Sequence, residues 1–201
     1  MTYRMKDCIQ QGICALLPVY DAEGGNCTRI LCSDQQERME GRVIKTVLRD
    51  IAAFYHMDIG LIRRKYGELI GCRNTIPLPF TPELILVPFK VRQPLGTNDG
   101  AYGYFSYLTI EGALAKGATV FIQLTDGREI PILESMRCYR NRMKNADIIR
   151  SRFLENFLSG SVKEVLWWEG GNAYRQPATR GDILLMASNL MNLMAQDKNG
   201  K

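Results

Sequence analysis

The segment from Ser135 to Phe153, SMRCYRNRMKNADIIRSRF, combines a hydrophobic stripe with a row of cations. On a helix with about 100° per residue, Arg137, Arg140 and Lys144 lie on the side opposite to the apolar residues. We therefore predict an amphipathic helix over residues 135–157 that packs on a core with one face and exposes cations on the other. The predicted core-facing residues are Met136, Tyr139, Met143, Ala146, Ile149, Phe153 and Phe157.

The exposed side of this predicted helix carries more positive charge than its own stability favours. Like charges three or four residues apart on a helix cost roughly a few tenths of a kcal/mol per pair, and Asp147 offsets little of this cost. Phosphate groups or an acidic protein surface would supply the missing counter-charge. A basic face that contacts only solvent is the plain alternative.

The positive charge of the whole chain is concentrated in two segments. The net charge is +5, but residues 42–65 carry six Lys and Arg against two acids, and residues 137–152 carry six against one. The remainder of the chain is net negative. Such segregation is typical of a surface that binds an anionic partner, nucleic acid in particular.

Turn and strand signals predict antiparallel β-structure. Residues 11–19 and 27–32 read as two strands joined by the turn DAEGGN, and residues 101–110 are rich in aromatic and β-branched residues. In residues 118–133, apolar runs flank the dipeptide Asp126-Gly127, which favours a tight hairpin turn. Residues 83–89 predict an edge strand, because Pro88 cannot donate a backbone hydrogen bond.

Helical spacing of Val43, Val47, Ile51 and Phe54 predicts a helix over residues 42–55, with Lys45 and Arg49 turned outward. Gly60 and Gly67 bracket the basic segment LIRRKY, and three prolines between residues 77 and 82 oppose regular structure. A C-terminal helix is expected to begin at Asp182, and its apolar residues are expected to pack in the core or at a dimer interface. The expected fold class is α+β, in which antiparallel hairpins pack with several helices. Residues 1–196 are expected to form a single domain, followed by a flexible tail at 197–201.

Several functional classes are disfavoured by the residues. The N-terminus lacks a secretory apolar region and no apolar run reaches the roughly 20 residues of a membrane span, so we expect a cytoplasmic protein without membrane contact. The six cysteines have no metal-site spacing and are expected to be reduced and mostly buried. His56, the only histidine, has no nucleophile motif around it, and no phosphate-binding or dinucleotide motif is found. We therefore expect no catalytic residues, no metal and no cofactor.

From about Leu48 to Phe153, the order of features resembles the competence transcription factor family ComK. An aromatic pair is followed by a basic tract with a glycine, and then by a cation shortly before a proline. Next come LILVPF, YFSYLTI, the DGR hairpin and the basic helix. The positions are Phe54, Tyr55, Arg63 to Lys65, Gly67, Arg73, Pro77, 84–89, 104–110, 126–128 and 135–153.

The resemblance implies a sequence-specific activator of competence genes. Family members bind double-stranded DNA at paired A/T-rich boxes, largely through the minor groove, as homodimers or higher oligomers. The resemblance further implies contact with RNA polymerase and control by an adaptor and protease system. The nearest candidate for the adaptor-binding segment is VLWW, residues Val165 to Trp168. The alternative is that these residues belong to the hydrophobic core.

A narrow A/T-rich minor groove concentrates negative potential, so arginines on loops or helix ends are its expected readers, with other cations on phosphates. A non-catalytic basic module that binds RNA or an acidic protein is the alternative function. The predicted DNA-binding residues are Arg63, Arg64, Lys65, Arg73, Arg137, Arg140 and Lys144.

Overall fold

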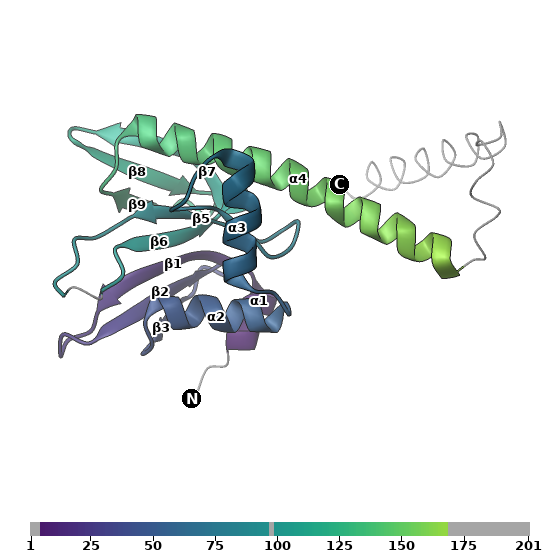
Figure 1. The fold of residues 1–201 in the computed structure, drawn as a ribbon. Coiled ribbons are helices and arrows are strands. Elements are labelled where there is room, and N and C mark those ends of the chain that lie inside the picture. Colours follow the sequence, from purple (N-terminus) through teal and green to yellow (C-terminus); the bar gives the residue numbers. More distant parts are fainter. Residues whose placement is uncertain (1–4, 97–98, 169–201) are drawn as a thin grey trace, which may run out of the picture. The chain divides into compact units, whose positions relative to one another are not determined.

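The computed structural model describes residues 5–96 and 99–168 of the chain. The chain divides into two units, Met1–Glu155 and Asn156–Lys201. The first unit has helices and two antiparallel sheets, which confirms the expected α+β class (Figure 1). The expected C-terminal helix and tail lie outside the described residues.

Six strands form the larger sheet, in the order β3-β2-β1-β6-β5-β4. Their bounds are β1 Ile13–Tyr20, β2 Asn26–Cys32, β3 Glu37–Glu40, β4 Leu78–Pro79, β5 Ile85–Lys90 and β6 Tyr102–Ser106. The smaller sheet has the order β7-β8-β9, with β7 Ile110–Lys116, β8 Thr119–Leu124 and β9 Glu129–Ile132. All pairings are antiparallel, as in β1 and β2, where Leu16 lies opposite Ile30.

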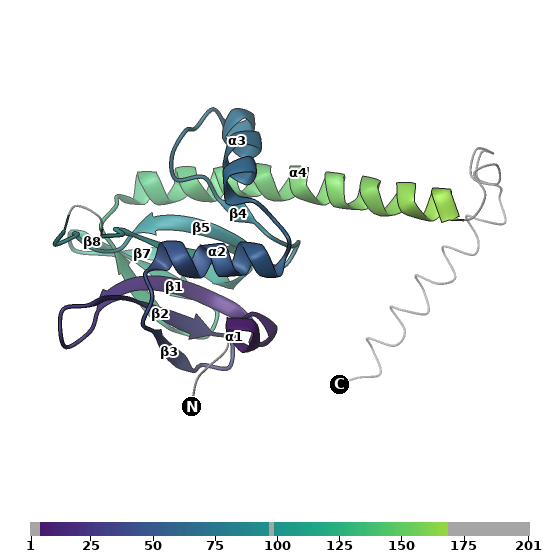
Figure 2. The ribbon, with the colours of Figure 1, turned by 60° about the horizontal axis from the view of Figure 1, so that its bottom comes forward.

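Four α-helices and one 3-10 turn complete the described part. They are α1 Met5–Gln11, α2 Ile44–Phe54, α3 Ile59–Ile70, the turn η1 Tyr107–Thr109 and α4 Met136–Trp168. Figure 2 shows α2 and α3 beside the larger sheet. None of the helices in the described ranges is both long and apolar enough to cross a membrane.

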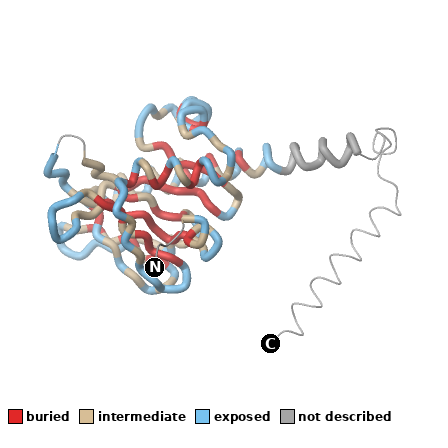
Figure 3. Tube along the Cα trace, turned by 90° about the horizontal axis from the view of Figure 1, so that it is seen from below, coloured by how far each residue is buried: buried red, intermediate tan, exposed pale blue. Residues whose placement is uncertain are grey.

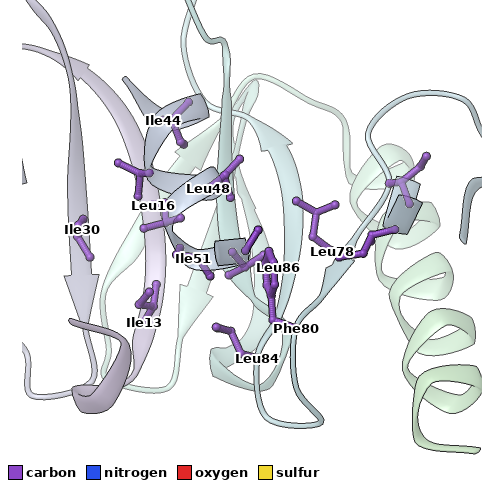
Figure 4. Close-up of a cluster of buried hydrophobic side chains, with 14 of the residues drawn as sticks. Ile13, Leu16, Ile30, Ile44, Leu48, Ile51, Leu78, Phe80, Leu84 and Leu86 are labelled. Carbon is purple, nitrogen blue, oxygen red and sulfur yellow. The ribbon is translucent and has the colours of Figure 1, made fainter. Parts of the chain in front are cut away.

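Two hydrophobic cores lie on opposite faces of the larger sheet. Successive strand residues point to opposite faces, so Leu16 packs with α2 and α3 in the first core while Leu17 packs against the smaller sheet in the second. Figure 4 shows Leu16, Ile51 and Leu86 in the first core. Buried residues accordingly line the strands, and exposed residues lie mainly in turns and on outer helix faces (Figure 3).

The first part of α4 contributes to both cores. Ala146 belongs to the second core, and Ile149 and Phe153 belong to the first. The Tyr139 ring stacks on Phe89 of β5 with centroids 5.6 Å apart. The predicted stripe is thus confirmed up to Phe153, whereas Phe157 is 53% exposed rather than core-facing.

The hairpins on either side of DAEGGN and Asp126-Gly127, and the helix predicted over residues 42–55, are confirmed. The edge assignment of β5 is wrong over Ile85 and Leu86, because the two-residue strand β4 pairs there. Pro88 lies beyond β4 and has a ladder partner only in Tyr104 of β6, so its missing N–H is tolerated.

Two further expectations are corrected. The strand expected over residues 101–110 ends at Ser106, where η1 carries the chain into the smaller sheet at β7. Gly60 and Gly67 do not bracket a separate segment but lie inside α3, which begins after the cap Asp58 and ends at Gly71. The basic tract of residues 63–65 is therefore mid-helix, rather than in a loop or at a helix end.

Candidate nucleic-acid interface

Local capping and one close backbone contact position α3. The Asp58 side chain accepts a hydrogen bond from the Leu61 backbone N–H at 2.7 Å, and Gly71 ends the helix with φ 66°. At Gly67, an added Cβ would lie 2.6 Å from the Cys72 carbonyl oxygen, so only glycine allows the following loop to pass this closely. Ile62 and Tyr66 point into the core, which leaves the cations of residues 63–65 exposed.

The loop after α3 lies against α4. Arg142 donates to the Thr75 backbone carbonyl at 3.5 Å, and the Asn145 amide lies 3.9 Å from the Cys72 sulfur. Thr75 has φ 57°, a left-handed conformation that is rare for a β-branched residue. These contacts bring Arg73, which the loop carries, next to the basic helix.

Arg63 lies at the junction of three surface hollows. One, of about 460 Å³, is lined by Arg63, Arg64 and Arg73 and also by the carboxylate of Glu68. A second, of about 340 Å³, lies between α2 and α3 and brings in Lys45 and Arg49. Cations from α2, α3 and the following loop thus surround Arg63, although they are distant in sequence.

The third hollow, of about 420 Å³, has an aromatic wall. Tyr102 and Tyr104 are two residues apart on β6, and both line it together with Arg63 and Arg73. The Arg63 guanidinium donates to the Tyr104 hydroxyl at 3.5 Å. Burial raises the pKa of the Tyr104 phenol, and the positive charge of Arg63 opposes that rise. The phenol is therefore neutral near pH 7, and Arg63 keeps its own positive charge unpaired.

Arg142 behaves differently from its basic neighbours. Its side chain is only 11% exposed, and it forms a two-pronged ion pair with Glu134. Burial is the largest single effect and lowers the pKa of Arg142, but the hydrogen bonds and negative charge of Glu134, together with Cys138, outweigh it, so the pKa is raised. The guanidinium also lies 5.6 Å from the Tyr102 ring centroid. Arg142 thus supports the surface from beneath and is not a free cation.

All seven predicted DNA-binding residues are exposed, and none of them forms an ion pair within the described ranges. The structure brings Arg63, Arg64 and Arg73 together. Lys65 lies over the Tyr66 ring at 5.4 Å and lines none of the three hollows. Three predicted DNA-binding cations of α4 are exposed and do not line these hollows either. They are Arg137, Arg140 and Lys144. Their roles in DNA binding stay predictions.

Two more cations of the basic segments are paired with acids. Arg42 pairs with Glu40 and Asp50, and Arg152 pairs with Glu155. Sequence reasoning did not include Lys45, Arg49, Tyr102, Tyr104 or Asn74 in the site. Lys45 and Arg49 could have been found from their outward position on the predicted helix, whereas the tyrosines read only as strand residues.

The expectation of reduced, mostly buried cysteines is met. All six cysteines are free, four of them buried and Cys72 and Cys138 partly exposed. His56 is an exposed residue with φ 54° just after α2. The side chains of residues 165–168, the adaptor-binding candidate, lie outside the described residues. Comparisons of the chain with protein-family models, curated proteins and solved structures found no match.

Proposed function

We propose that this protein is a DNA-binding regulator whose interface is the cationic surface around Arg63, continued by the outer side of α4. One observation carries the proposal. Exposed cations from three separate elements converge on Arg63, and none of them forms an ion pair among the described residues. A basic face that contacts only solvent can arise from the residues of a single helix. Here the cations around Arg63 come from α2, α3 and the loop at residue 73, which are separate parts of the chain. Such a surface suits a polyanion.

Activation of competence genes through A/T-rich boxes is the specific form of the proposal, and it rests on the resemblance to the ComK family. Arginine is the residue best suited to a narrow minor groove, and Arg63, Arg64 and Arg73 share one hollow. The adjacent α4 cations would contact phosphates on the same duplex. A cytoplasmic location, homo-oligomers and contact with RNA polymerase belong to the same proposal.

Duplex binding at several salt concentrations tests the function. For B-DNA, the logarithm of the binding constant falls with the logarithm of salt with a slope of about −0.9 per neutralised phosphate. We expect a slope that corresponds to several phosphates, and we expect A/T-rich duplexes to be enriched when random duplexes are selected at two ionic strengths. Binding that does not depend on salt would refute the interface. If RNA or an acidic protein competes better than any duplex, the protein is a basic interaction module instead.

A further inference from the structure

The hollow of about 420 Å³ differs in chemistry from the rest of the cationic surface. Tyr102, Tyr104 and Pro88 supply aromatic and apolar walls, while Arg63 and Arg73 enter from α3 and from the loop. Asn74, whose amide has donors and acceptors, also lines it. Cations alone would suit a phosphate chain, so the aromatic walls call for a ligand with a flat apolar part.

The two rings have limited freedom to move. Arg142 lies over the Tyr102 ring at 5.6 Å and is itself held by Glu134 and by the Thr75 carbonyl. The Tyr104 hydroxyl is bonded to Arg63, and the Tyr104 side chain packs against the first core. A rigid aromatic wall stacks a ligand ring with little loss of side-chain entropy.

Paired bases cannot use such a wall, because in a duplex their faces are covered by neighbouring bases. An unpaired base exposes its face, and proteins bind such bases by stacking on aromatic side chains beside cations that hold the backbone. The same hollow offers the Asn74 amide, which can bond the edge of a base.

We propose that this hollow binds one unpaired nucleotide of DNA, with the base against Tyr102 and its phosphates held by Arg63 and Arg73. The proposal rests on the DNA-binding function and adds that the protein favours DNA in which a base has left the stack. A/T-rich DNA would supply such bases readily, because pyrimidine–purine steps such as TA unstack easily.

Two otherwise identical duplexes test the proposal, one fully paired and one with a single unpaired 2-aminopurine in an A/T-rich centre. We expect the wild-type protein to bind the bulged duplex more tightly and to change the 2-aminopurine fluorescence. Tyr102→Ala should weaken bulged-duplex binding by about 5- to 150-fold, the range for loss of one stacked base, with little effect on the paired duplex. Tyr102→Phe, which keeps the ring, should bind the bulged duplex like wild type.

The outcomes separate this proposal from the proposed function. Equal affinity of the wild type for both duplexes, or an equal loss for both in Tyr102→Ala, would overturn the nucleotide site and leave duplex binding standing. Absence of binding to either duplex would refute both. Circular dichroism and urea unfolding of Tyr102→Ala check its fold. If this variant is unfolded, Asn74→Ala, altered at an exposed loop residue, serves as a second test, and the proposal then requires a loss confined to the bulged duplex.

Discussion

The guanidinium of Arg142 donates a hydrogen bond to the backbone carbonyl of Thr75 over 3.5 Å. This contact joins α4 to the loop that carries Arg73. Through this contact Arg142 holds the loop that carries Arg73. Because Arg142 is paired with Glu134 and is mostly buried, it does not compete with the exposed cations for an anion.

Replacing Arg142 by Met should destabilise the protein strongly. The Glu134 side chain is only 10% exposed, and the substitution would leave its carboxylate buried without its partner, which costs about 3–5 kcal/mol when such a pair is broken. Urea unfolding of the variant measures the loss. The double variant Arg142→Met with Glu134→Leu should recover much of the stability, because neither charge remains. If the single and double variants are equally unstable, lost packing rather than the unpaired carboxylate is the cause.

Thr75→Asn should raise the free energy of unfolding by a fraction of the roughly 1–2 kcal/mol that the left-handed conformation costs an ordinary residue. Thr75 has φ 57°, and asparagine adopts the left-handed conformation more readily than a β-branched residue does. The bond from Arg142 is made to the backbone carbonyl and is retained. A fall in the urea midpoint would mean that the Thr75 side chain contributes more than its backbone conformation costs.

The cysteines provide a chemical footprint of the interface. Alkylation requires the thiolate, and burial raises the pKa of Cys32 to about 12, so this thiol should not react in the native protein near pH 8. The partly exposed Cys72 lines the hollow with Arg63, Arg64 and Arg73 and should react. Duplex DNA should slow this reaction, as followed by mass spectrometry. An unchanged Cys72 rate at saturating DNA would place the DNA elsewhere.

The acid stability of the hairpin between β8 and β9 should depend on Asp126. Hydrogen bonds from Arg128 lower the pKa of the Asp126 carboxyl, and Arg128 also donates to the Cys32 carbonyl at 2.8 Å. The folded-state pKa lies below the unfolded value of about 3.9, so this contribution is present above pH 4 and is lost as the pH falls through the folded pKa.

Asp126→Asn should therefore lower the free energy of unfolding by about 1–3 kcal/mol at pH 7, the range for loss of a charged hydrogen bond. The difference from wild type should shrink at pH 3, where the wild-type contribution is itself being lost. Urea unfolding at both pH values measures this. A difference of the same size at pH 3 would show that the charge of Asp126 is not what stabilises the hairpin.

Elements with strong local signals were predictable from the sequence. The turn residues fixed the two hairpins, and the spacing of Val47 and Ile51 identified α2. The short elements α1 and β3 carry little periodicity, and β3 depends on pairing with β2, so neither was predicted. The helix α3 was missed because its two glycines read as breaks, whereas Asp58 caps it and packing of Ile62 and Tyr66 stabilises it.

The candidate site was predictable only in part. Charge counting identified Arg63 and Arg64, and the resemblance to the ComK family added Arg73. The count also included Arg42 and Arg142, whose acidic partners are found only in the folded chain. The meeting of β6 tyrosines with Arg63 depends on sheet order and on the path of the loop, which no local pattern contains. The wall of the nucleotide-sized hollow was therefore invisible in the sequence.

Reversal of charge at Arg63 and Arg64 tests the central claim most directly. Fluorescence anisotropy would measure three double variants: Arg63→Glu/Arg64→Glu, Arg137→Glu/Arg140→Glu, and a control, Lys6→Glu/Lys116→Glu. The control changes the net charge equally away from the three hollows, and it also breaks the exposed Lys116–Glu129 ion pair, so its fold is checked by circular dichroism. We predict that the first two variants keep the wild-type fold and lose duplex affinity by about 100-fold or more, since attractions become repulsions, while the control loses far less. Equal affinity losses in all three would show that net charge alone drives binding, and retained affinity in the first two would contradict the interface outright.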